Sequence, residues 1–370
     1  MSGAVISLMR EPSRFKYAIR TLYGEAIDFS FHYPLEIVRE AGPKESLHYY
    51  LYKYSKTPSC RSVLRLDSNG IAQVWGRLTG VVYRPGFVAT YALHNLEEYL
   101  RNGNPLRLEV FSNQVRWLEQ HAVVRRDGAV VWPHDFDLHE GPVPLKAPWV
   151  SANAQGLVMS ALVRAWRITR QPRLLELLRG SARIFQLDHK CGGVRVTAEE
   201  HTVYTEVPGL PSPGIMDGFM RSLLGLYDLY IETGDEAVHG LFAEGIDGLR
   251  YFLPRWDYKN RWSMYSNRCY LCPPNYHCLN RLLLTVLASL TGDSYLAQYA
   301  AAWNPDRLST LDRAEIYVAF LYTKNACRFK FKAWRQGIKE TELMQKAAVA
   351  DHGPNLLSPA DKSQFHQLRP

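Results

Sequence analysis

The sequence predicts a mainly α-helical protein, an incomplete α/α toroid of repeated helical hairpins with a small β-containing region at the N-terminal end. Segments with apolar side chains at helical spacing come in pairs, and short turns such as Thr233-Gly234-Asp235-Glu236 and Thr291-Gly292-Asp293-Ser294 separate the members of a pair. The turns recur every ~60 to 70 residues, which indicates an internal repeat. Long segments join one pair to the next. Long connections at one end of a ring wall a cleft, which a plain solenoid does not need.

The N-terminal region, residues 1–80, carries the expected strands. Residues 46–55 alternate apolar and polar side chains, and residues 62–78 place the turn Asp67-Ser68-Asn69-Gly70 between two β-rich runs. We expect this region to pack on the helical part that follows.

The helical part, residues 81–325, contains four predicted hairpins. They are 86–101 with 106–123, 154–169 with 173–186, 218–232 with 237–253, and 278–290 with 295–303. The long connections are 122–149, 187–214 and 254–277. A further helix is expected over 312–322. Residues 326–370 are predicted to form a basic helix and a polar tail.

Composition narrows the choice of partner. The net charge of +8 favours anionic partners, and the 22 tyrosines and 9 tryptophans suit either sugar stacking or an aromatic core. The body of the chain has no Lys/Arg-rich run and no nucleic-acid motif, so we expect no nucleic-acid partner. No apolar run approaches about 18 residues and no signal peptide is seen, so we expect no membrane span and a cytoplasmic location.

The cysteines are expected to be free thiols. Cys269, Cys272 and Cys278 lie near His277, but only one C-x2-C pair is present and no second pair follows. A zinc site needs about four ligands, usually in two pairs. We therefore predict no metal and no cofactor.

The stretch 262–281 in the third connection is the richest in reactive side chains. It holds three tyrosines, two arginines, a histidine and three cysteines, and we place it in a loop before an apolar helix that starts near Leu282. The other two connections add aromatic, acidic and basic groups. The first holds Trp132, His134, Asp135, Asp137 and Trp149; the second, with the start of the next helix, holds Arg195, Glu199, Glu200, His201, Tyr204, Glu206 and Asp217. Such a mixture in one cleft of a basic toroid favours a polysaccharide site.

Five stretches within residues 75–305 resemble one enzyme family. Residues 145–169 contain Trp-x-Ser-x-x-Ala-Gln-Gly from Trp149, and residues 203–229 contain Tyr204-x-Glu206 followed by Gly-Phe and Gly-Leu-Tyr-Asp. Tyr265-x-x-Arg268, Asn275-Tyr276-His277 and residues 83–96 complete the set. Together they resemble the C-terminal catalytic domain of the D-glucuronyl C5-epimerases of heparin and heparosan chemistry.

The resemblance implies a reaction and a set of roles. Such enzymes remove the C5 proton of a uronic acid in a polymer and return it from the other face, so an anionic polysaccharide is the implied substrate. Tyr276, Tyr265, Tyr204 and Glu206 match the catalytic positions, and Arg268 matches the arginine that neutralises the sugar carboxylate. Nearby cations would have to favour the phenolates, and Arg261, Arg268, His277 and Arg281 are the candidates in this loop. The remaining substrate contacts are predicted at His277, Asn280, Arg281, Trp149, Gln155 and Tyr91. A homodimer is also implied.

Three departures from the family pattern keep alternatives open. Val207 replaces a tyrosine, Asn280 replaces a histidine and Asp217 replaces an asparagine. A lyase needs only one base plus elimination, and a glycosidase needs two carboxylates, for which Glu206 with Asp217 or Asp135 are candidates. A non-catalytic protein that binds acidic glycans is the third alternative.

Overall fold

The computed structural model describes residues 29–31, 35–37, 52–54, 64–76, 79–138, 144–267 and 270–326. Arg268, Cys269 and the predicted C-terminal helix and tail beyond residue 326 lie outside the described residues, as does most of the N-terminal region before residue 64.

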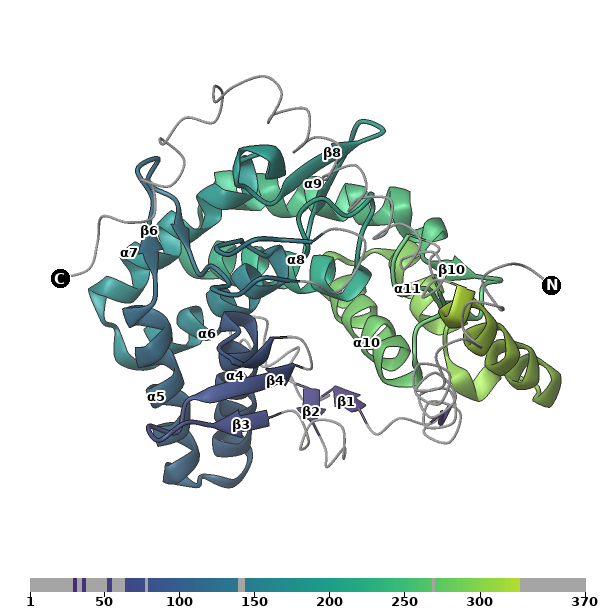
Figure 1. Ribbon diagram of the computed structural model, residues 1–370, viewed down its shortest axis with the longest axis horizontal. Helices are drawn as coiled ribbons and strands as arrows, with labels where there is room; N and C mark the ends of the chain where they lie inside the picture. The colour runs from purple at the N-terminus through teal and green to yellow at the C-terminus, as the bar shows by residue number, and fades with distance from the viewer. Residues whose placement is uncertain are drawn as a thin grey trace, which may run out of the picture.

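Helical hairpins form the body of the protein, as predicted. The four pairs are α4 (Pro85–Asn102) with α5 (Pro105–Gln120), α6 (Ala152–Thr169) with α7 (Pro172–Ser181), α8 (Met216–Thr233) with α9 (Glu236–Phe252), and α10 (Pro274–Thr291) with α11 (Ser294–Ala302). The first helices of the pairs pack in series, α4 on α6, α6 on α8 and α8 on α10, and each carries its partner on the outside. Figure 1 shows the pairs following one another from α4 and α5 to α10 and α11. The fold class predicted from the repeat is confirmed.

Local signals set the turns within the hairpins. Gly234 and Gly292 end α8 and α10 in the left-handed conformation, with φ of 63° and 70°, which glycine adopts without a Cβ clash. Asp235 and Asp293 then cap α9 and α11 by accepting hydrogen bonds from backbone N–H groups in the first turn. The recurring Gly-Asp pair therefore ends one helix and starts the next.

Each long connection between hairpins contains a small antiparallel β-hairpin that the sequence patterns had not shown. The pairs are β6 (Val123–Val124) with β7 (Val130–Val131), β8 (Arg195–Ala198) with β9 (His201–Tyr204), and β10 (Asp257–Tyr258) with β11 (Trp262–Ser263). Strands β7 and β9 pack on the outer helices α7 and α9. These β-hairpins give the connections regular structure. The segment after each β-hairpin leads into the next inner helix.

The N-terminal strands pack against the first and the last of the inner helices, α4 and α10. β1 (Leu35–Ile37) pairs with β2 (Tyr52–Tyr54), and β1 lies against α10 while β2 lies against α4. β3 (Leu64–Leu66), β4 (Ala72–Gly76) and β5 (Gly80–Val82) form a three-stranded sheet next to α4. The predicted turn between β3 and β4 is confirmed, because Asp67 Oδ1 accepts hydrogen bonds from the N–H groups of Asn69 and Ile71, both at 2.8 Å.

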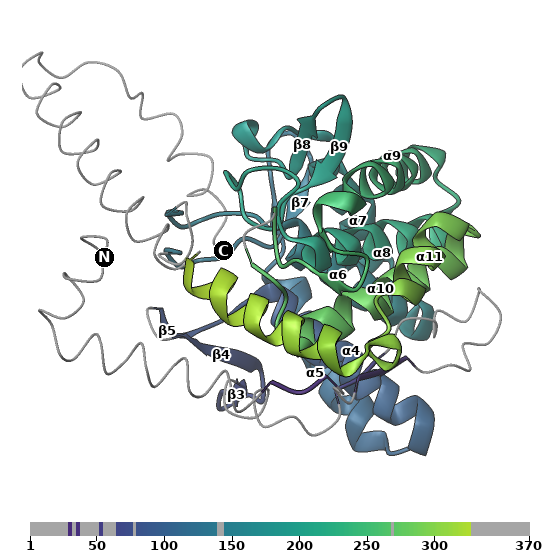
Figure 2. The same cartoon turned by 90° about the vertical axis from the view of Figure 1, so that its right-hand side faces the viewer.

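The chain after the last hairpin forms a helix over 310–326, longer than the 312–322 predicted. Its buried side chains Ile316 and Phe320 join Trp262, Met264 and Leu271 in a second, smaller apolar cluster. Arg261 forms ion pairs with two residues of this helix, Asp312 at 2.7 Å and Glu315 at 3.2 Å. Figure 2 shows this helix in yellow-green, turned toward the viewer.

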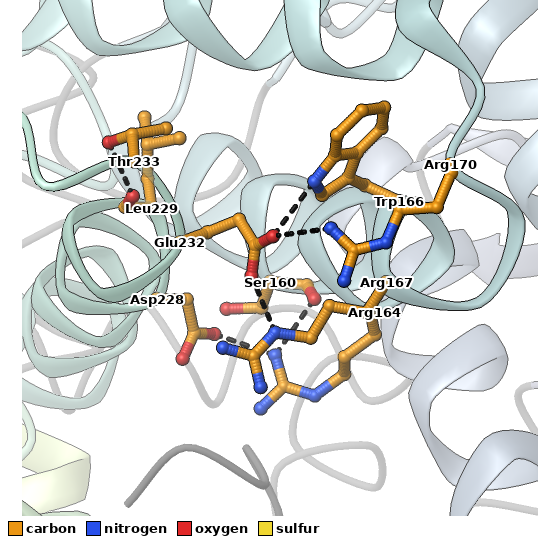
Figure 3. Close-up of polar contacts among 9 residues, drawn as sticks. All are labelled: Ser160, Arg164, Trp166, Arg167, Arg170, Asp228, Leu229, Glu232 and Thr233. Carbon is orange, nitrogen blue, oxygen red and sulfur yellow. Dashed lines mark hydrogen bonds and ion pairs between the residues drawn. The ribbon is translucent and has the colours of Figure 1, made fainter.

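Helices α6 and α8 make the tightest contact of the arc. A Cβ built on Gly225 would lie 2.4 Å from the carbonyl oxygen of Gly156 and 2.5 Å from its Cα, so only glycine allows this approach. Toward the C-terminal ends of the two helices, Arg164 pairs with Asp228 at 2.7 Å, with 4% and 0% of the two side chains exposed. Beside them Glu232 accepts from Trp166 Nε1 at 2.8 Å and from Arg167 Nε at 2.5 Å (Figure 3). The pair α6–α8 is therefore a rigid unit.

Candidate active site

The starts of the inner helices gather polar side chains that are far apart in the sequence. Arg84 directly precedes α4, Asn153 is the second residue of α6, Asp217 the second of α8 and Tyr276 the third of α10. Glu206, from the second long connection, joins them: Asn153 hydrogen-bonds to it, and the charges of Asp217, Arg221 and Arg84 all act on it. Four helix N-termini thus point their positive dipole ends toward one cluster, which favours negative charge there.

Glu206 and Asp217 form a coupled carboxylate pair at the start of α8. Asp217 is 4% exposed, and Glu206 is partly buried. A Cβ on Gly218 would lie 2.0 Å from Glu206 Oε2, so the carboxylate of Glu206 rests on the bare backbone next to Asp217. Burial, and then the charge of Asp217, raise the pKa of Glu206 to about 7. Burial also raises the pKa of Asp217, against the charge of Arg221 at 3.7 Å.

Tyr265 and Tyr276 face this pair with their rings edge to face and 5.3 Å apart, and Tyr270 stacks on Tyr265 at 5.0 Å. Burial raises the pKa of Tyr276, and the charges of Asp217 and Glu206 raise it further. The pKa of Tyr265 is raised by burial, by its two tyrosine neighbours and by the same carboxylates. Both phenols therefore keep their protons at neutral pH.

Three of the four cations expected to favour phenolates, Arg261, Arg281 and His277, do not do so in the described residues, and the fourth, Arg268, lies outside them. The guanidinium of Arg261 binds Asp312 and Glu315 on the 310–326 helix. Arg281 donates from Nε to the Ala300 carbonyl. Burial lowers the pKa of His277 to about 3, so this histidine is neutral. The carboxylates Glu206 and Asp217 favour the protonated phenols, and at Tyr276 the charge of Arg221 opposes them without reversing the upward shift of the pKa.

Arg84, directly before α4, is supported by an aromatic ring of the first long connection. The Arg84 guanidinium lies 5.1 Å from the centroid of the Phe136 ring. His134 stacks on Trp149 at 4.1 Å, and burial together with the charge of Arg84 lowers the pKa of His134 to about 3. Within the part of the chain that the structure describes, Arg84 Nε and His134 Nδ1 are buried with no hydrogen-bond partner. Arg84 is thus held in place with hydrogen-bonding capacity left over.

Two residues predicted at the site lie in the hydrophobic core instead. The Tyr204 side chain is 0% exposed, packs edge to face on Phe185 and donates its hydroxyl to the Leu241 carbonyl at 2.7 Å. Gln155 is 0% exposed and donates from Nε2 to the carbonyl oxygens of Val130 and Ser181. These contacts argue against a catalytic role for Tyr204 and a substrate contact by Gln155. Both residues hold the β-hairpin connections against the helices.

The predicted loop before residue 282 is wrong, because α10 begins at Pro274. His277 and Asn280 therefore point from the helix into the protein. His277 stacks on Trp262 at 3.5 Å, with Ser263 and Trp303 at its ring nitrogens. Asn280 donates from Nδ2 to Ser263 Oγ and to the buried Cys272 thiol. These contacts argue against substrate binding by His277 and Asn280. A substrate contact by Arg281, which is partly buried, stays a prediction.

Two further residues predicted as substrate contacts, Trp149 and Tyr91, are partly buried. Trp149 lies against His134 and Phe136 near Arg84, and Tyr91 lies on α4. Sequence reasoning missed Arg84, Asn153 and Arg221. Their common signal is position, since each lies next to or within the first turns of an inner helix.

These features define an α/α toroid with an acid–base cluster at the starts of its inner helices. Residues 126–305 match the family model described as D-glucuronyl C5-epimerase C-terminus. A D-glucuronyl C5-epimerase of Caenorhabditis elegans is 28% identical over 189 residues, which cover 46% of this chain and 31% of that protein. The resemblance of this segment to the D-glucuronyl C5-epimerases, first seen in the sequence, is therefore confirmed.

Other similar proteins are more distant or have no assigned role. An uncharacterized protein of Methanocaldococcus jannaschii is 24% identical over 220 residues, which cover 55% of this chain and 70% of that one. Among solved structures, cellobiose 2-epimerase from Bacillus thermoamylovorans gives a TM-score of 0.39 at 14% identity, with 59% of each chain covered. A D-mannose isomerase gives 0.42 at 12% identity, with 65% of this chain and 64% of that one covered. Likenesses this distant say nothing about the reaction. The chain spans about a third of the length of the C. elegans relative.

Proposed function

We propose that this protein is a carbohydrate epimerase that inverts C5 of glucuronate residues in a heparosan-like anionic polysaccharide. The family match of residues 126–305 supports the class of reaction. The observation that carries the proposal is the cluster in which Glu206, half-deprotonated near neutral pH, lies with the protonated phenols of Tyr276 and Tyr265.

Epimerisation at C5 needs two groups in opposite protonation states. One removes the C5 proton from one face of the sugar ring, and the other returns a proton from the opposite face. Glu206, with a pKa of about 7, is a base matched to neutral pH. Tyr276, whose phenol keeps its proton, is the acid, with Tyr265 beside it as its relay. This assignment replaces the pair of tyrosine bases implied by the resemblance, and it works without the tyrosine that Val207 replaces.

The carboxylate of the substrate must also be neutralised, because the C5 proton lies next to it and its removal builds up negative charge. Arg84 and Arg221 are the described cations that act on Glu206. Together with the N-termini of the inner helices they supply positive potential for a bound uronate and for the enolate-like intermediate. The same role predicted for Arg268 stays a prediction, as do the homodimer and the cytoplasmic location. Among the described residues, no helix is long and apolar enough to cross a membrane.

A polysaccharide lyase is the second candidate. It would use Glu206 to take the same C5 proton, and the protonated Tyr276 would donate to the departing oxygen at C4. The two reactions share the first step, so the arrangement of acid and base supports both. They differ in what happens to the intermediate, and therefore in the product.

The test is incubation of the protein with heparosan-type polymer in deuterated water. Deuterium at C5 in an intact chain supports the epimerase, whereas ultraviolet absorbance from an unsaturated uronate identifies a lyase. Glu206→Gln should abolish the exchange, and Tyr276→Phe should lower it about 10²–10⁴-fold. Tyr251→Phe is the matched control, since Tyr251 lies on the surface and donates to Glu199. Absence of C5 exchange with every acidic polymer of this type would refute the proposal.

A further inference from the structure

The least explained group in the cluster is Asp217. It is almost fully buried at the start of an inner helix, where the backbone N–H groups of Asp217 and Gly218 hydrogen-bond to its carboxylate. The guanidinium of Arg221 lies 3.7 Å away, outside ordinary hydrogen-bond range. Two buried carboxylates with so little direct countercharge are costly if both are ionised. Ionised Asp217 therefore lowers the stability of the folded protein, which a neutral side chain of the same shape would not do.

We propose that Asp217 is a positioning residue that acts through Glu206: the two carboxylates hold one proton between them, and this sharing sets the pH range in which Glu206 serves as the base. The inference rests on the proposed function for its catalytic meaning, and on the geometry of the cluster for the sharing itself. Like charges in one buried site cannot both ionise easily, so the proton that one loses is kept by the other.

The packing keeps the pair together. Glu206 Oε2 occupies the space where a Cβ of Gly218 would be, so no side chain at this position separates the Glu206 carboxylate from the start of α8. Asn153 holds Glu206 by a side-chain hydrogen bond from α6. Helices α6 and α8 are in direct backbone contact through Gly156 and Gly225, and this contact keeps Asn153 on α6 close to the start of α8.

The other charged and titratable neighbours of Glu206 come from three elements and the third connection. Arg84 at the start of α4 and Arg221 on α8 act on Glu206 and favour its ionised form. Tyr265 and Tyr276 from the third connection and α10 are neutral, and so is the buried thiol of Cys272, whose pKa burial raises. Among these neighbours, Asp217 is the one whose charge raises the pKa of Glu206.

The sharing is tested without substrate. The carboxyl carbons of glutamate are labelled with ¹³C, and the signal of Glu206 is identified by its loss in Glu206→Gln. We expect this signal to titrate near pH 7 in the native protein and about one unit or more lower in Asp217→Asn, which keeps the shape and removes the charge. Asp247→Asn, which makes the same charge change on the surface, should leave it unchanged.

Two results would overturn the proposal: a Glu206 signal that titrates in the ordinary carboxyl range in the native protein, or one that titrates near neutrality in both proteins. The catalytic consequence is read from the pH profile of C5 exchange. The acid limb of this profile should move to lower pH in Asp217→Asn. At pH 5.5 the exchange rate, expressed as a fraction of each protein's plateau rate, should be about tenfold higher in the variant than in the native protein. Overlapping profiles would remove the role of Asp217 in the reaction. A protein without exchange but with the expected titration would refute the epimerase and leave the shared proton standing.

Discussion

Replacing Asp228 by alanine tests how much the buried Arg164–Asp228 ion pair between α6 and α8 contributes to the stability of the protein. In the native protein Arg164 and Asp228 are 4% and 0% exposed and lie 2.7 Å apart (Figure 3). The substitution leaves the charge of Arg164 buried without this partner, and breaking a buried ion pair in this way costs about 3–5 kcal/mol. At about 2 °C per kcal/mol for a domain of this size, the melting temperature should fall by roughly 6–10 °C.

The assay is thermal unfolding followed by circular dichroism at fixed protein concentration. Glu176→Ala is the control, because Glu176 and Arg173 form an exposed pair at 3.2 Å whose loss should hardly move the melting temperature. The apolar double variant Arg164→Met/Asp228→Leu should recover most of the loss, since it removes both charges. A fall of less than about 2 °C for Asp228→Ala would refute the reasoning that this pair ties the two helices together.

The other predictions concern the reaction. The rate of C5 exchange in the native protein should rise with pH through about 7, because the base Glu206 must lose its proton; a rate independent of pH from 5 to 9 would exclude Glu206 as the base. Tyr276→Phe removes the acid while keeping the ring on Tyr265, and should lower kcat about 10²–10⁴-fold; kcat within threefold of native would place the acid elsewhere. Arg84→Gln should raise KM for the polymer by about tenfold or more, since it removes a charge that faces the substrate carboxylate; an unchanged KM would show that Arg84 serves the fold alone.

The sequence was informative where local signals decide the structure. The hairpin repeat could be predicted because glycine stops and aspartate caps lie at fixed places such as Gly234 and Asp235, which depend only on neighbours in the chain. The stretch around Tyr265 and Tyr276 was likewise found from its composition. The start of α10 was misplaced because Pro273-Pro274 looks like a loop, although proline is well suited to the first helical position.

The site could be predicted only in part because its electrostatics depend on contacts between distant segments. Glu206 takes its pKa from Asp217, Asn153, Arg221 and Arg84, and no pattern along the chain shows that these groups meet. For the same reason, Tyr204 looked catalytic from its motif although its hydroxyl is used inside the core. A motif fixes the kind of side chain, whereas the packing of the helices decides which side chains face the substrate.

In the proposed reaction a carboxylate on one face of the sugar and a phenol on the other carry out the inversion, and the isotope distribution at early times distinguishes this from a one-base reaction. The polymer is incubated in deuterated water, and the reaction is stopped when a few per cent of the residues are inverted. Because the acid draws its proton from solvent, deuterium should appear at C5 of the inverted residues while the unreacted glucuronate residues keep hydrogen. Inverted residues that retain the original hydrogen, or equal deuterium in both sets at the earliest times, would contradict the account.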